Sequence, residues 1–256
     1  MPEASPGRRV LVALDAVSRS ETTLRTAGAL AAELDAELAG LFVEDEDLAR
    51  LFSLPFAREL SVLSGNVRAV SQADIERSWR HDAAALERRL AEAAAALQVR
   101  WSFQVARGRM AAELSVQAPG FDLVVLGERA AALPEAVPPA GRAGPVLVLA
   151  EPGQATGVLD LARRLARRYR TDLVFLIPAA GEDAFQAACD DAGRAIGGGR
   201  EAARCLPLDS CEPVSLLRVT RREAAACLVL RGRARYLQPA ALRTFDRMAC
   251  PVVLAP

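Results

Sequence analysis

The stretch RRVLVALD at residues 8–15 decides the fold, because it is an unbroken apolar run that ends in a carboxylate. Such a run is typical of a parallel strand that is buried on both faces of a sheet. A helical pattern of apolar residues follows it, and AELAGLFV at residues 36–43 predicts the next strand. Strand, helix and strand in this order form a βαβ unit, so the beginning of the chain predicts an α/β fold.

The same alternation continues downstream. Apolar residues recur at steps of three and four over residues 69–97, which predicts a long amphipathic helix. A strand at residues 99–107, a short helix near residues 111–117 and the apolar strand DLVVLG at residues 122–127 follow. Together these segments predict a doubly wound, mostly parallel sheet.

The pattern then begins again. TDLVFLIP at residues 171–178 corresponds to the earlier segment 36–43, and ACLVLRG at residues 226–232 corresponds to DLVVLG. This internal repeat of about 125 residues predicts two units in tandem.

We place the two units at residues 1–143 and 144–256. The strand PVLVLAE at residues 145–151 could end the first unit or begin the second, and the helix that directly follows it favours the second. On that interpretation the first unit lacks its fifth strand and the helix before it.

Composition and charge exclude several classes of protein. All 32 basic residues are Arg and they match 32 acidic residues, so no global field attracts nucleic acid. The apolar runs are far shorter than the roughly 20 residues of a membrane span, and the first residues lack the apolar stretch of a secretory signal. Five cysteines without CxxC spacing favour a reducing compartment. We therefore expect a soluble, cytoplasmic protein that binds neither nucleic acid nor membrane.

The residues at the strand ends resemble the universal stress protein family. In that family the first strand ends in Asp, the second ends near a Val, and the fourth ends in the Gly that opens a G-x-x-G phosphate loop. Here VLVALD supplies Asp15, LFVED supplies Val43, VARGRMAAEL supplies Gly108 and DLVVLG supplies Gly127. The resemblance covers most of the chain, twice. It implies two Rossmann-like units and makes Asp15 and Val43 candidates for contacts with a nucleoside.

The phosphate loop of the first unit departs from the family pattern. Ala130 stands where the second Gly is expected, and Glu128 adds a negative charge beside it. The later Gly-Ser or Gly-Thr is replaced by Gly141 and Arg142, displaced by one residue. Glycines let backbone N–H groups approach phosphate, so their replacement predicts that ATP or AMP binds weakly or not at all. Arg142 either contacts a phosphate or is a solvated loop residue. The nucleotide-binding candidates are Asp15, Val43, Gly108, Gly127, Gly141 and Arg142, and the sequence indicates neither a catalytic residue nor a metal ligand.

The second unit departs further from the pattern. Its first strand ends in Glu151, followed by Pro-Gly, and its loop reads GRAR at residues 232–235. We interpret this unit as a structural partner that has lost the site. In the alternative interpretation, several arginines bind another anion: Arg231, Arg233, Arg235 and Arg243.

Three charged or apolar segments have two interpretations each. The acidic residues 44–47 could bind a divalent cation, but they also suit a helix N-terminus, which we favour. Residues 48–63 predict a helical flap over the nucleotide cleft or a partner surface. The arginines between residues 163 and 170 could attract nucleic acid or acidic lipid, although a solvated helix face explains them as well.

The resemblance implies a non-enzymatic stress-response protein that binds or regulates, with a degenerate adenine-nucleotide cleft. A slow ATP-handling enzyme and a dimerisation scaffold without ligand are the alternatives. We also expect a homodimer, formed through the terminal strands or residues 48–63, and a further protein partner of unspecified kind.

Overall fold

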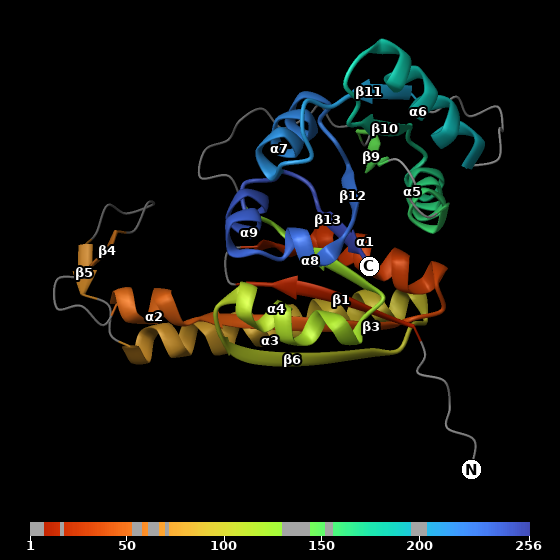
Figure 1. Cartoon of the computed structure of the whole chain (residues 1–256). Coiled ribbons are helices and arrows are strands. Elements are labelled where there is room, and N and C mark those ends of the chain that lie inside the picture. Colours follow the sequence, from red (N-terminus) through yellow and green to blue (C-terminus); the bar gives the residue numbers. More distant parts are fainter. Residues whose placement is uncertain are drawn as a thin grey trace.

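The computed structural model describes residues 8–15, 18–52, 58–60, 67–69, 72–129, 144–151, 156–195 and 204–256. Within these residues, one sheet of nine strands runs through the molecule in the order β11-β10-β9-β12-β13-β7-β1-β3-β6 (Figure 1). The α/β class and the mostly parallel sheet predicted from the sequence are thus confirmed.

Four parallel strands come from the first half of the chain. They are β1 (Arg9–Leu14), β3 (Glu37–Asp45), β6 (Trp101–Gly108) and β7 (Leu123–Leu126). Strand β1 lies between β3 and β7, and β6 lies beyond β3. The chain therefore winds outward from β1 in both directions, as a doubly wound sheet requires.

Five parallel strands come from the second half. They are β9 (Val146–Leu149), β10 (Leu173–Ile177), β11 (Arg204–Pro207), β12 (Cys227–Arg231) and β13 (Val252–Ala255). Strand β9 lies between β10 and β12, the position that β1 holds in the first half. All the described hydrogen-bonded neighbours of β9 thus belong to the second half, and the described residues of the first half contribute no fifth strand to the sheet.

The two halves meet at an antiparallel strand pair. Val253 of β13 lies opposite Val125 of β7, with Val252 opposite Leu126 and Leu254 opposite Val124. The last strand of the second half therefore occupies the sheet edge that the first half leaves unfilled. The two halves therefore share one sheet. The internal repeat in the sequence predicted two units but did not indicate that their strands would join.

Helices cover both faces of the sheet. One face carries α1 (Ser20–Glu33), α3 (Gln72–Leu97), α5 (Thr156–Tyr169) and α6 (Glu182–Ala195). The other carries α4 (Met110–Gln117), the 3₁₀ turn η1 (Ala118–Gly120), α7 (Pro213–Arg222), α8 (Arg233–Tyr236) and α9 (Pro239–Phe245). Each face has one buried apolar cluster that draws on both halves.

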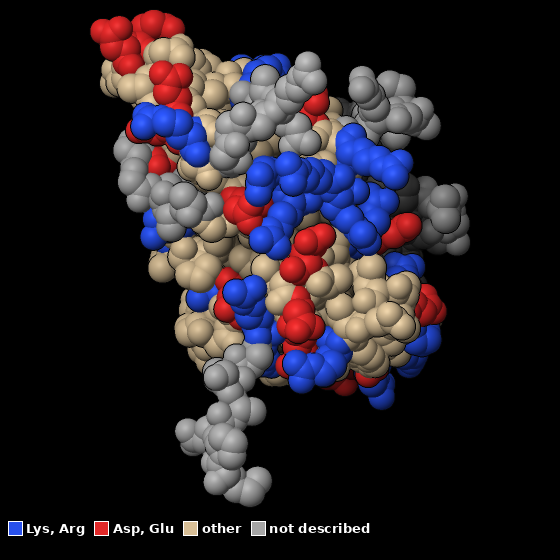
Figure 2. Space-filling model, turned by 90° about the vertical axis from the view of Figure 1, so that its right-hand side faces the viewer, with Lys and Arg blue, Asp and Glu red and all other residues tan. Residues whose placement is uncertain are grey.

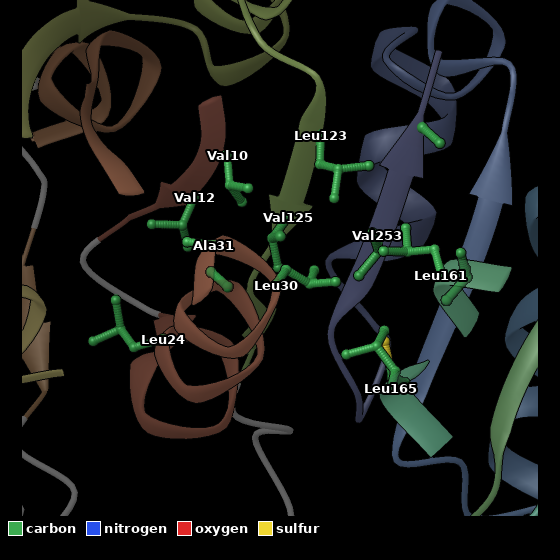
Figure 3. Close-up of a cluster of buried hydrophobic side chains, with 14 of the residues drawn as sticks. Val10, Val12, Leu24, Leu30, Ala31, Leu123, Val125, Leu161, Leu165 and Val253 are labelled. Atoms are coloured by element: carbon green, nitrogen blue, oxygen red, sulfur yellow. The ribbon is translucent and has the colours of Figure 1, made fainter. Parts of the chain in front are cut away.

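The cluster beneath α1 and α5 shows how the halves are joined. Val12 and Val125 of the first half, Val253 of β13 and Leu165 of α5 belong to the same buried cluster (Figure 3). At its margin, the Tyr169 hydroxyl lies 2.6 Å from Thr26 Oγ1. Burial across the junction is continuous, so hydrophobic packing as well as strand pairing holds the halves together.

Two predicted helices differ from the structure. The helix expected over residues 69–97 begins at Gln72, because residues up to 69 form β5 (Val67–Ala69). In the segment 48–63, α2 (Glu46–Phe52) ends early, and β4 (Arg58–Leu60) pairs antiparallel with β5. The expected helix is therefore confirmed for residues 48–52 and wrong for residues 58–60, and the role of the segment as a flap or a partner surface stays a prediction.

Candidate functional site

The nucleotide-binding candidates of the first half lie at the carboxyl ends of adjacent parallel strands. Asp15 directly follows β1 and is partly exposed, whereas Val43 in β3 is buried. Leu14 is paired with Phe42, so Asp15 and Val43 lie one position further along the same two strands. Gly127 directly follows β7, the other neighbour of β1. We call the carboxyl ends of β1 and β7, marked by Asp15 and Gly127, the first switch point, because the strand order reverses there.

A short antiparallel ladder connects the two sides of the first switch point. Strand β2 (Ser18–Arg19) pairs with β8 (Glu128–Arg129), with Ser18 opposite Arg129 and Arg19 opposite Glu128. The chain that leaves β1 is thereby tied to the chain that leaves β7. The backbone of Glu128 and Arg129 is thereby paired with another segment of the same half.

The other candidates are placed less closely together. Gly108 ends the outer strand β6, opposite Asp45, and a Cβ atom built on it would lie 2.9 Å from Glu113 Oε1. The space beside Gly108 is thus used by a side chain of α4. Gly141 and Arg142 fall outside the described residues, so their contact with a phosphate stays a prediction.

The acidic segment 44–47 forms the start of α2. Glu46 and Asp47 lie in the first turn of that helix, and Asp45 Oδ1 accepts a hydrogen bond from the Asp47 backbone N–H at 2.9 Å. Arg109, just after β6, donates to both carboxylate oxygens of Asp47, at 2.8 and 3.0 Å. The hydrogen bonds from Arg109 lower the pKa of Asp47. Negative charge at a helix N-terminus, paired with Arg109 and with Arg50 of the same helix, accounts for this segment.

The corresponding position of the second half is filled by interacting side chains. We call the carboxyl ends of β9 and β12, marked by Glu151 and Gly232, the second switch point. The guanidinium of Arg235 lies 3.4 Å from Glu151 Oε1 and 3.7 Å from Glu212 Oε1. Its Cζ atom lies 5.3 Å from the ring centroid of Tyr236. Arg235 is therefore neutralised by carboxylates and covered on one side by an aromatic ring.

A thiol and a phenol complete this cluster. Burial, followed by the neighbouring Glu151 carboxylate, raises the pKa of the Cys211 thiol. Burial also raises the pKa of Tyr236 to about 12, and its hydroxyl donates to the Cys211 carbonyl oxygen at 3.3 Å. Both groups therefore carry their protons at neutral pH.

The backbone after Gly232 also differs from that of a phosphate loop, because a phosphate loop is followed by a long helix. Gly232 has a φ of +83°, a left-handed conformation that favours glycine, and α8 after it is a single short turn. Arg233 donates to the Phe121 carbonyl oxygen of the first half. Arg233 and Arg235, two of the arginines considered for an anion site, are thus engaged with other parts of the protein.

The arginines of α5 form a basic area on one face. Figure 2 shows this area on the side of the molecule that carries α5. Asp160 pairs with Arg163 and Arg164 at 2.6 and 2.8 Å, and Glu33 of α1 lies 3.9 Å from Arg164. Carboxylates therefore neutralise part of this cluster from within the protein. None of the described helices is both long enough and apolar enough to pass through a bilayer.

Sequence reasoning missed two features of these positions. Nothing in the sequence indicated the β2–β8 ladder, because two-residue bridges have no hydrophobic pattern. The Arg235–Glu151 contact had a signal, since an acid ends one strand and an arginine-rich loop follows another at the same edge of the sheet. The sequence suggested that those arginines bind an external anion, whereas in the structure Arg235 binds the carboxylate of Glu151.

Comparisons with known proteins bear on the fold. No protein-family model and no curated protein matches the chain. A universal stress protein from Archaeoglobus fulgidus matches with a TM-score of 0.52 and 11% identity, over 96% of this chain and 95% of that one. A protein of unknown function from Pseudomonas aeruginosa matches with a TM-score of 0.52 and 14% identity, over 97% and 92%. A putative universal stress protein from Pseudomonas aeruginosa matches with a TM-score of 0.49 and 14% identity, over the same shares.

At this level of identity the likeness concerns the fold. It extends over nearly the full length of both chains, so it includes both halves of the sheet and not only one unit. The resemblance inferred from the strand-end residues is thereby confirmed in three dimensions. The chain has the fold of a universal stress protein with two units in tandem.

Proposed function

We propose that this chain is a non-enzymatic, stress-response binding or regulatory protein whose first half binds adenine nucleotide weakly. A single observation carries the proposal: at both switch points, where doubly wound sheets bind ligands, the segments that follow the strands bind other groups of the chain itself. At the first, the β2–β8 ladder joins the flanking segments. At the second, Arg235 and Glu151 form an ion pair.

The first switch point keeps part of what a nucleoside needs. Asp15 and Val43 lie side by side on β1 and β3, where a carboxylate and an apolar surface could contact a ribose and a base. The phosphate side is weaker, because Glu128 contributes its backbone to the ladder and brings a negative charge. These features support a site that still accepts a nucleoside but holds its phosphates poorly.

Two observations support a role without catalysis. Phosphoryl transfer needs a metal ion held by free carboxylates near the phosphates. Asp47, in the acidic segment after β3, is instead held by two hydrogen bonds from Arg109. Glu151 is likewise held by Arg235 at the second switch point. The five cysteines form no disulfide, which favours the reducing cytoplasm as the place of action.

Calorimetric titration with Mg-ATP and with AMP tests the proposal. Each charge-assisted hydrogen bond to phosphate contributes roughly 1.5–3 kcal/mol. The loss of two such bonds weakens binding by about 3–6 kcal/mol, or roughly two to four decades in Kd. We expect binding too weak to saturate at micromolar nucleotide, and no phosphate release over hours.

A pair of double variants identifies the cause. Ala130→Gly with Arg142→Ser restores the family's loop residues, and we expect it to strengthen Mg-ATP binding at least about tenfold. Ala234→Gly with Arg243→Ser makes the same two kinds of change in the second half and should have no effect. Tight binding by the unaltered protein, or nucleotide released from it on denaturation, would contradict the proposal.

A further inference from the structure

The two outer strands of the sheet are unlike each other. Strand β11 is short and ends in Pro207, so it offers little edge for pairing. Strand β6 runs from Trp101 to Gly108 without proline and without an acidic residue, and its ribbon follows the lower margin of the molecule (Figure 1). In the described part of the chain, no strand pairs with its outer side. A long uncovered edge of this kind is a template for another strand.

The hydrogen bonds of β6 show which residues face outward. The Leu38 N–H of β3 donates to the Arg100 carbonyl oxygen at 2.8 Å. In a parallel pair, alternate residues direct both backbone groups to the same neighbour, so Ser102 and Gln104 also bond to β3. The backbone groups of the odd-numbered residues therefore point to the free edge: Trp101, Phe103, Val105 and Arg107.

The side chains of these residues lie on the α3 face. A Cβ atom at Gly40 would lie 2.8 Å from the Phe103 ring and 2.7 Å from Leu90 of α3, so Phe103 packs over β3 on that face. Arg107 is stacked on Trp79 of α3, with its Cζ atom 5.8 Å from the ring centroid. Trp101 and Val105, in contrast, remain 40% and 47% exposed. The free edge thus combines unpaired backbone with exposed apolar side chains.

We propose that two copies of this chain pair antiparallel through β6, around a two-fold axis at Gln104. The axis is perpendicular to the sheet and passes beside Gln104. Odd-numbered residues of one copy therefore lie opposite odd-numbered residues of the other, and even-numbered residues lie opposite even-numbered ones. In this register Phe103 faces Val105 of the second copy, and Trp101 faces Arg107 of the second copy. All outward-facing residues then pair with one another, through about eight backbone hydrogen bonds.

Side-chain chemistry fits a second copy as the occupant. The register places an aromatic ring beside a β-branched side chain and a guanidinium beside an indole, two favourable cross-strand pairs. Arg100 meets Gly108 of the second copy, so no arginine faces an arginine. If the axis lay at Val105 instead, Trp101 would face Arg109 of the second copy. Arg109 lies beyond the end of β6, so Trp101 would lose its partner within the strand.

This edge differs from both routes expected from the sequence, the terminal strands and residues 48–63, and the strand pairing argues against the first of them. The terminal strand β13 has β12 on one side and β7 on the other, and β1 likewise has two neighbours. Neither strand has an unpaired edge for a second copy. Association through β6 would continue the sheet across the two-fold axis without disturbing either switch point.

Sedimentation velocity on the full chain tests the proposal. We expect dimers at micromolar concentration, and we expect Val105→Lys to raise the dimer dissociation constant at least tenfold. This change alters only an exposed side chain and keeps the backbone N–H and C=O groups, so it leaves the bonds between β3 and β6 in place. Val116→Lys is the matched control, because Val116 on α4 is 79% exposed and lies off the edge, and it should remain dimeric. A monomeric unaltered chain, or equal dimerisation of Val105→Lys, would overturn the proposal.

Disulfide trapping tests the register and does not depend on the stability of Val105→Lys. Residues at the two-fold axis form a non-hydrogen-bonded pair with Cα atoms about 4.5 Å apart, within reach of a disulfide. Gln104→Cys should therefore form covalent dimers with oxidised glutathione, whereas Ser102→Cys, about 13 Å from its counterpart, should not. The unaltered chain under the same oxidant measures the background from its native cysteines. Trapping by Ser102→Cys but not by Gln104→Cys would refute the register.

Discussion

The two switch points occupy equivalent places in the fold but are filled by different kinds of interaction. At the first, main-chain atoms of β2 and β8 pair with each other. At the second, side chains of Arg235, Glu151 and Tyr236 interact. Main-chain pairing depends little on side-chain identity, whereas an ion pair depends on both partners. A main-chain ladder leaves a side chain such as Asp15, a candidate for contact with a nucleoside, unconstrained by pairing, whereas at the second switch point the side chains bind each other.

This difference has a structural counterpart in the sheet. The second half supplies all its own strands, and its last strand also completes the first half through the β7–β13 pair. The first half consequently depends on the second for the burial of β7. We infer that the second half is a structural support for the first.

The largest expected effect tests this dependence. Leu254 in β13 is fully buried at the junction, and Leu254→Ala should lower the free energy of unfolding by about 2–5 kcal/mol. Both tryptophans, Trp79 and Trp101, lie in the first half, so their fluorescence reports that half, while circular dichroism reports the whole chain. We expect the urea midpoints from both probes to fall together.

The control for this variant is Leu51→Ala, the same change at a side chain that is 55% exposed, which should leave both midpoints almost unchanged. A fluorescence midpoint that stays in place while the dichroism midpoint falls would mean that the halves unfold independently. The first half would then not depend on the second for its stability.

A smaller effect distinguishes the two switch points themselves. Arg235→Ala removes an ion pair with Glu151 and the contact with Tyr236, and we expect a loss of about 1 kcal/mol, because half the side chain is exposed and screened by solvent. Arg129→Ala leaves the main-chain ladder with Ser18 in place and should cost less than about 0.5 kcal/mol. Urea unfolding of both variants measures the difference. Equal losses would show that the first switch point also depends on side-chain identity.

Much of the fold could be predicted because buried parallel strands leave an uninterrupted apolar run in the sequence. The segments 8–15, 36–43 and 122–127 each contain a strand of the sheet, and each ends at the carboxyl edge as predicted. The same reasoning placed Asp15, Val43 and Gly127 close together. Their role in nucleotide binding stays a prediction, since position at a strand end does not determine affinity.

The junction and the early end of α2 could not be predicted in the same way. Pairing of β13 with β7 depends on which sheet edge remains unfilled after folding, and no local pattern encodes that. In the segment 48–63 the apolar residues suggested a helix, although Pro55 just beyond Phe52 is a signal for a helix end that we gave too little weight. The contact between Asp47 and Arg109 joins residues far apart in the chain, so only the folded structure reveals it.

The smallest expected effect concerns the carboxylate of Asp47, on the acidic segment that follows β3 in the first half. Hydrogen bonds from Arg109 hold the pKa of Asp47 below its ordinary value. A lowered folded-state pKa contributes stability above the unfolded-state pKa of about 3.9, and this contribution is lost as the pH falls through the folded-state pKa.

Asp47→Asn should therefore lower the melting temperature at pH 7 by no more than about 3 °C, because both side chains are exposed. As the pH falls through the folded-state pKa, the melting temperatures of the variant and the unaltered protein should converge. Glu46→Gln, which removes one charge from the same helical turn but leaves the Arg109 contact, separates the specific pair from the general charge of that turn. A difference between Asp47→Asn and the unaltered protein that did not shrink as the pH was lowered would show that the contact acts through shape and not through charge.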